Sequence, residues 1–211
     1  MPPDDLLQRL LREDTFENET FRDLDLEGAQ LEGKELYRCT FESCRLQESR
    51  WKNSRLEDCD VKGSDLTRAL FDGTGLRGVR FEGCKLMGID WSRAAPLPEL
   101  SFAECNLRYA SFVGQSLRRT AFLRCSAQEA NFLDSDLSEC DFAGTDLSGA
   151  TVRGCTLGDT DFSGAQGLLL EPSRNRVKDT RVGVEAAVAL AHALGLRVAG
   201  YAPEPVRRKK R

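Results

Sequence analysis

A large apolar residue recurs at every fifth position between Phe16 and Phe162, and most residues between these positions are polar or charged. The stripe forms two runs, from Phe16 to Trp91 and from Leu97 to Phe162, separated by one extra residue. Together they give 30 repeats that contain all 11 Phe and both Trp. A period of five fits neither a helix nor a flat strand. A short fixed period sustained over about 150 residues is typical of a stacked solenoid.

Two positions in each repeat have the character of buried residues. Besides the large central residue, the residue two positions before it is usually Cys, Ser or Ala, as at Cys39, Ser54 and Ala110. Two positions after the centre, Gly occurs in 12 of the 30 repeats. We therefore expect the centre and the small residue to point inward, with a turn near each Gly that bends the chain at every repeat.

The kind of central residue indicates how many sides each coil has. Among alternate centres counted from Phe21 to Phe162, 12 of 15 are Phe or Trp, whereas in the other set only Phe16 is aromatic. An alternation with a period of ten residues requires an even number of sides, and four is the smallest even number that encloses a core. The sequence thus predicts an all-β solenoid, a quadrilateral β-helix with five residues per side and 20 per coil.

The pattern changes at the N-terminus and in the middle of the rod. Within an N-terminal cap at 1–15, residues 3–12 have the pattern of a short amphipathic helix that covers the open end of the first coil. The repeat region is expected at 16–166, with a phase slip at 92–97. Pro96 and Pro98 lack backbone donors, so we expect a bulge or a loop there.

Beyond Phe162 the register is expected to stop. The segment 167–200 then forms a C-terminal module, with a last strand at 167–170, a connection at 174–183, a helix at 184–194 and a strand at 196–198. The apolar surplus of this module predicts a homodimer joined tail to tail, and the alternative is a monomeric cap. The expected interface residues are Val184, Val188, Leu190, Leu194, Leu196 and Val198. The basic segment 201–211 is expected to be a disordered tail.

The composition indicates in which cellular compartment the protein is expected. The chain has no long apolar run that could span a membrane, and its acidic N-terminus lacks a signal-peptide core, so a cytoplasmic protein is expected. All eight Cys stand two positions before a centre. This placement predicts buried reduced thiols that act as small apolar residues. No CxxC spacing suggests zinc.

No catalytic constellation is visible. The single His, His192, has no partner motif, and no phosphate-binding loop, dinucleotide fingerprint or nucleophile elbow is present. The sequence therefore predicts a protein that is not an enzyme and has no cofactor and no metal site.

Charge is unevenly distributed along the chain. Residues 126–165 hold eight acids against one base, Arg153, whereas residues 166–211 hold ten basic and four acidic residues. An acidic rod could compete with DNA for a cationic groove. The candidate binding residues are Glu129, Asp134, Asp136, Glu139, Asp141, Asp146, Asp159 and Asp161.

The repeat unit, small–polar–Leu/Phe–polar–Gly, resembles that of the pentapeptide-repeat family. Clean copies are Ser64-Asp65-Leu66, Ala130-Asn131-Phe132, Ser135-Asp136-Leu137 and Thr145-Asp146-Leu147-Ser148-Gly149. The resemblance covers most of the chain and implies a right-handed quadrilateral β-helix, in agreement with the four sides deduced from the spacing.

The chain is also similar to the subgroup of this family that protects type II DNA topoisomerases from poisons, which includes the Qnr proteins and the immunity proteins against microcin B17 and albicidin. The similarity lies in the two runs of repeats, in residues 84–91, and in residues 175–181 with the helix and residues 194–198 that follow. The long loops of the Qnr type are missing, which favours the immunity-like branch. The resemblance implies a DNA-mimicking dimer that binds DNA gyrase or topoisomerase IV and does not itself bind nucleic acid. The alternative is a non-enzymatic scaffold or an interaction module with another partner.

Overall fold

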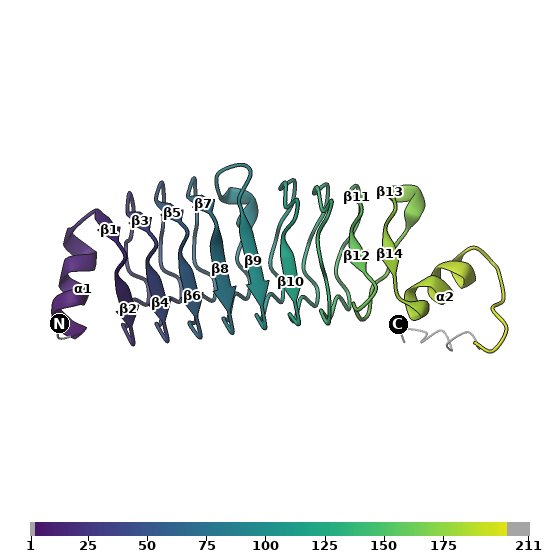
Figure 1. The fold of residues 1–211 in the computed structure, drawn as a ribbon, viewed down its shortest axis with the longest axis horizontal. Coiled ribbons are helices and arrows are strands. Elements are labelled where there is room, and N and C mark those ends of the chain that lie inside the picture. Colours follow the sequence, from purple (N-terminus) through teal and green to yellow (C-terminus); the bar gives the residue numbers. More distant parts are fainter. Residues whose placement is uncertain (1–2, 202–211) are drawn as a thin grey trace, which may run out of the picture.

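A computed structural model describes residues 3–201. These residues form a β-solenoid rod with a short helix at each end (Figure 1). Helix α1 spans Pro3–Arg12, as expected, and α2 spans Val184–Ala193. The strands are β1 Thr15–Glu17, β2 Thr20–Arg22, β3 Glu35–Tyr37, β4 Thr40–Glu42, β5 Arg55–Glu57, β6 Asp60–Lys62, β7 Gly75–Arg77, β8 Val79–Glu82, β9 Leu100–Ala103, β10 Ala121–Leu123, β11 Thr156–Gly158, β12 Asp161–Phe162, β13 Arg176–Lys178 and β14 Arg181–Val182.

Pairing between coils confirms the four-sided prism. Strands 20 residues apart pair in parallel, so that Phe16 lies beside Leu36 and Phe21 beside Phe41. We number the faces in chain order. Face 1 carries β1, β3, β5, β7, β11 and β13, and face 2 carries β2, β4, β6, β8, β9, β10, β12 and β14. Faces 3 and 4 pair mainly through single bridges, such as Asp65–Lys85 on face 3 and Ser111–Asn131 on face 4. About eight coils at a spacing of ~4.8 Å give a rod roughly 38 Å long.

The core is a set of stacked central side chains, and every predicted centre except Leu97 is buried. On face 2 the rings of Phe122 and Phe142 stack with centroids 4.8 Å apart, and on face 4 those of Phe112 and Phe132 stack at 5.1 Å. Rings of the two faces also meet edge to face, which suits their quadrupoles. Two opposite aromatic walls are thus present, as the alternation predicted. Each buried centre contributes about 1.5–3 kcal/mol before chain entropy is counted.

The phase slip forms a loop, as expected, but its detail differs from the sequence pattern. A 3-10 turn at Trp91–Arg93 opens the segment, and the chain between β8 and β9 projects beyond the other turns (Figure 1). The prediction that Leu97 begins the second run is wrong, because Leu97 is 73% exposed and Pro98 is buried instead. Phe81 pairs with Phe102, 21 residues later, so the loop absorbs the extra residue.

The coil continues further than the expected boundary at residue 166. Leu157 pairs with Val177 and Phe162 with Val182, both at the regular distance of 20 residues. The five-residue register therefore resumes after Gly167 and Pro172, which occupy two central positions and conceal it. The segment expected as a connection contains β13 and β14, and neither 167–170 nor 196–198 forms a strand.

Each end helix packs against the neighbouring coil. In α1, Leu10 is fully buried. The buried Lys34 ammonium donates to the carbonyl of Glu13 at 2.5 Å and pairs with Asp14 at 3.2 Å, which fixes the end of the helix to the first coil. In α2, Ala186 and Leu190 pack against the core. None of the helices found in residues 3–201 is long and apolar enough to cross a membrane.

Candidate functional site

The eight candidate acids form a belt around the rod. Face 1 carries Asp136, Glu139 and Asp159, face 2 carries Asp141 and Asp161, face 3 carries Glu129 and Asp146, and face 4 carries Asp134, as their positions in the 20-residue repeat require. We call these eight residues the acidic belt. The structure brings them onto neighbouring coils, but it does not gather them on one face.

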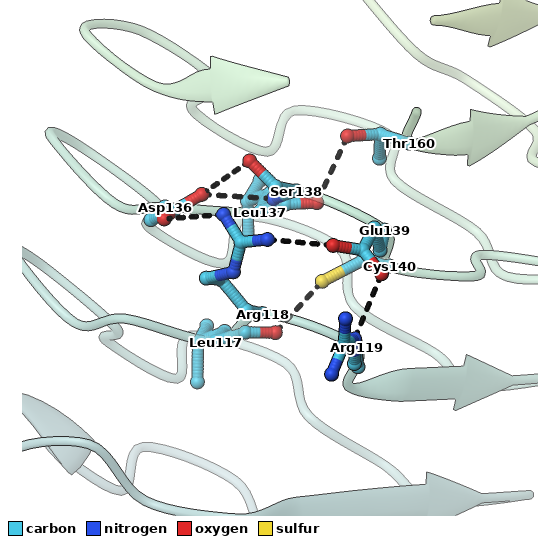
Figure 2. Close-up of polar contacts among 9 residues, drawn as sticks. All are labelled: Leu117, Arg118, Arg119, Asp136, Leu137, Ser138, Glu139, Cys140 and Thr160. Carbon is cyan, nitrogen blue, oxygen red and sulfur yellow. Dashed lines mark hydrogen bonds and ion pairs between the residues drawn. The ribbon is translucent and has the colours of Figure 1, made fainter. Parts of the chain in front are cut away.

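Three members of the belt are paired with arginine. Figure 2 shows Arg118 bridging Asp136 and Glu139, at 3.7 and 2.6 Å, while Arg119 reaches the second Glu139 oxygen at 2.7 Å. Asp161 pairs with Arg181 at 3.4 Å. The hydrogen bond from Arg119, together with the charges of both arginines, lowers the pKa of Glu139. Part of the charge surplus is therefore neutralised locally.

The other five belt acids, Glu129, Asp134, Asp141, Asp146 and Asp159, make no ion pair with any residue in 3–201. Hydrogen bonds from Ser148 lower the pKa of Asp146, and the amide of Ala143 donates to Asp141 at 2.8 Å. No basic side chain among the described residues neutralises these five carboxylates, so they are available to a cationic partner. Glu129, Asp134 and Asp159 are exposed corner residues.

The six expected interface residues are divided between two surroundings. Val184, Leu194 and Leu196 are 62%, 77% and 60% exposed. Leu190 instead packs against the last coil, and Val188 and Val198 are half-buried. Only three of the six residues expected at the interface are therefore exposed at this end of the rod.

The eight thiols are buried, as predicted. They donate weakly to backbone carbonyls inside the prism, and Figure 2 shows that of Cys140 on the carbonyl of Leu117, at 2.9 Å. Burial raises the pKa of Cys140 to about 12, so this thiol stays protonated. Within residues 3–201 no three His, Cys, Asp or Glu side chains gather as metal ligands. The Nε2 atom of His192 is buried without a hydrogen bond among the described residues.

Sequence reasoning missed a groove beside the phase slip. It has a volume of about 450 Å³ and crosses the corner between faces 1 and 2. Its lining comes from three successive coils: Gly78, Val79, Arg80, Glu99, Leu100, Ser101, Arg118, Arg119 and Thr120. The two prolines signalled the irregularity, but only the structure shows which residues of the neighbouring coils meet there.

Comparison with known structures agrees with the fold. Two trypsin-treated variants of QnrB1, described as a plasmid-mediated fluoroquinolone resistance protein, are 22% and 20% identical, with TM-scores of 0.51 and 0.54. The first match covers 89% of this chain and 92% of the other, and the second 88% and 97%. HetL from the cyanobacterium Nostoc, involved in heterocyst differentiation regulation, is 19% identical over 86% of this chain and 94% of its own, with a TM-score of 0.35.

No curated protein sequence matches the chain. At these identities the structural likeness concerns the fold alone. The model of the pentapeptide repeat region matches residues 34–112 and 79–162, which together make up more than half of the chain. With its 20-residue coils and buried five-residue register, this chain belongs to the pentapeptide-repeat family.

Proposed function

We propose that this protein binds a type II topoisomerase, DNA gyrase or topoisomerase IV, and protects it from a topoisomerase poison by occupying the DNA-binding surface. The observation that carries the proposal is the set of five belt acids without ion pairs, on the last coils of a narrow rod. Duplex DNA is itself a charged rod whose binding is largely electrostatic. The fold shared with QnrB1, a fluoroquinolone resistance protein, supports the same function.

The position of the belt favours a dimeric mimic. The belt lies on the coils that precede α2, and the exposed Val184, Leu194 and Leu196 follow directly. Two copies joined at this end would place both belts near a two-fold axis, which matches the symmetry of a dimeric enzyme. The protein would then act without catalysis, cofactor or direct contact with nucleic acid.

A supercoiling assay with purified gyrase and a panel of poisons tests the proposal. The test variant carries Glu129→Lys, Asp134→Lys and Asp159→Lys. The side chains of these residues make no hydrogen bond or ion pair in the described structure, and Arg119 and Arg124 adopt the same positive-φ corner conformation, so a basic side chain fits there. We expect the wild type to restore supercoiling and the variant to lose at least about tenfold in protective potency, because three charges change sign.

The matched control carries Asp23→Lys, Glu32→Lys and Glu82→Lys, three exposed acids without ion pairs in the first half of the rod. It changes the net charge equally and should keep its protective effect. Binding of the wild type to gyrase should weaken steeply with added salt. Equal protection by the two triple variants would show that the belt is not the binding surface. If the wild type protects neither gyrase nor topoisomerase IV against any poison, the proposal is wrong and the scaffold hypothesis is favoured.

A further inference from the structure

The groove at the phase slip contains a buried hydroxyl that has lost its acceptor. Thr120 is 2% exposed, and its Oγ1 has no hydrogen-bond partner among the described residues. Two coils further on, Thr160 donates to the carbonyl of Leu137, 23 residues earlier, at 2.8 Å. The same spacing assigns the carbonyl of Leu97 to Thr120, but Leu97 is turned outward with φ +59°. The extra residue therefore leaves an unsatisfied hydroxyl buried behind the groove wall, which costs stability.

Two arginines stand on opposite sides of this groove. Arg80 bonds through Nε to Asp60 at 2.6 Å, one coil toward the N-terminus. Arg119 bonds through Nε to Glu139 at 2.7 Å, one coil toward the C-terminus, as Figure 2 shows. Their terminal nitrogens make no hydrogen bond within residues 3–201. The coil of Ser101 lies between them, and both residues line the groove.

The remaining lining residues define what the groove can accept. Its one acid, Glu99, pairs with Arg77 at 3.7 Å, so its charge is balanced from outside the groove. The terminal nitrogens of Arg80 and Arg119 can only donate, whereas the Ser101 hydroxyl can donate or accept, so a ligand of the two arginines must supply acceptors. Val79 and Leu100 also line the groove, but they are buried at 0% and 7% exposure and belong to the core beneath it.

Beside the groove, face 2 changes from charged to small side chains. The outward positions of β8 hold Arg80 and Glu82, whereas those of β9 and β10 hold Ser101, Ala103, Ala121 and Leu123, all half-buried. A chain segment leaving the groove can therefore lie flat on this face without desolvating charges.

We propose that this groove binds an extended acidic segment of a partner protein, with an aspartate or glutamate carboxylate between Arg80 and Arg119. Guanidinium groups favour planar carboxylates because two parallel N–H···O bonds can form. A groove of about 450 Å³ that crosses three coils has room for several residues rather than one small ion. This surface lies apart from the five unpaired belt acids, so the proposal does not depend on topoisomerase binding.

The test is an NMR titration of the ¹⁵N-labelled full chain with two blocked tripeptides, acetyl-Leu-Glu-Leu-amide and acetyl-Leu-Gln-Leu-amide. We expect the glutamate peptide to shift the amide signals of Gly78, Ser101 and Thr120 in a saturable way. The glutamine peptide should bind at least about tenfold more weakly, because it cannot form the charge-assisted pair. Inorganic phosphate at the same concentration is the third probe.

Arg80→Gln and Arg119→Gln should each weaken the glutamate peptide severalfold. Arg124→Gln is the matched control, because Arg124 pairs with Glu104 outside the groove at 2.9 Å, and it should leave binding unchanged. The same spectra report whether each variant is folded, and Arg119→Lys replaces Arg119→Gln if the latter is not. Equal affinity for the two peptides, shifts remote from the groove, or stronger binding of phosphate than of the glutamate peptide would overturn the proposal.

Discussion

The small residue two positions before each centre links neighbouring coils by a hydrogen bond. Its hydroxyl donates to the carbonyl 23 residues earlier, as Ser54 does to Leu31 at 2.6 Å and Ser135 to Phe112 at 2.7 Å. The thiols of Cys140 and Cys155 take the same position with the carbonyls of Leu117 and Phe132. Where the slot holds Cys, Ser or Thr, the side chain can make this bond, whereas Ala69, Ala110 and Ala130 fill the same slot without it.

Thr145 offers a direct test of this hydrogen bond. Its hydroxyl donates to Phe122 at 2.6 Å and accepts from the amide of Cys125 at 3.0 Å, in a fully buried position. Thr145→Val leaves both backbone groups unsatisfied, and we expect a loss of about 1–3 kcal/mol in the free energy of unfolding. Denaturant titration measures it.

Thr120→Val is the matched control, because the Thr120 hydroxyl has no partner to lose. Its stability should stay within about 0.5 kcal/mol of the wild type or rise, since valine buries no unsatisfied donor. If both variants lost the same free energy, the hydrogen bond to the neighbouring coil would not be the source of the effect.

The backbone conformation of the corner residue, two positions after each centre, explains why glycine occurs there in only some repeats. It adopts a positive φ throughout most of the rod, at Gly63 with +55° but also at Asn18, Asp58 and Arg68. Side chains project into solvent at most corners, so polar residues can bear the left-handed conformation at modest cost. Gly167 also has a positive φ but stands at a central position, and a Cβ there would lie within 3 Å of the Ser148 backbone, so only glycine fits.

At the scale of elements, α1 packs against the first coil through one of its faces. Leu10 is fully buried against the first coil, whereas Leu11 beside it is 42% exposed. Leu10→Ala should lower the free energy of unfolding by about 2–5 kcal/mol, because it removes buried atoms and leaves a cavity at the open end of the prism. Leu11→Ala should change it little.

Urea titration of the two leucine variants gives the comparison, and hydrogen exchange at the amides of β1 and β3 locates the effect. A comparable small loss for both variants would mean that α1 contributes nothing to capping the first coil.

At the scale of the whole molecule, ion pairs run along the rod axis rather than around it. Arg22 pairs with Glu42, Arg80 with Asp60 and Arg124 with Glu104, in each case over 20 residues. Such exposed pairs add little stability individually. Acids without ion pairs remain along the described rod, among them Asp23, Glu32 and Glu82 in its first half and five members of the acidic belt near its end. The belt differs in its surroundings, because residues 126–165 hold a single basic residue, Arg153.

The proposed dimer makes a second prediction at this scale. Leu194→Asp combined with Leu196→Asp should give a folded monomer, because both side chains are largely exposed and a charge would have to be buried on association. Leu190 is unsuitable for this test, since it packs against the last coil. Light scattering after size-exclusion chromatography measures the mass.

Leu97→Asp changes a similarly exposed leucine in the middle of the rod and serves as the control. This variant should still have the mass of a dimer. A double variant that keeps the dimer mass would exclude this surface as the interface.

The sequence alone determined the prism, because a five-residue period with alternating ring and Leu centres requires an even number of sides, and four is the smallest even number that encloses a core. It also placed the thiols inside and the loop at Pro96 and Pro98. Three features depended on contacts between residues 20 or more apart: the continuation of the coil to Val182, the pairing of Asp136 and Glu139 with arginines of the preceding coil, and the groove around Thr120. The repeat fixes which way a side chain points, but its partner comes from the next coil, and one extra residue changes every partner at that corner.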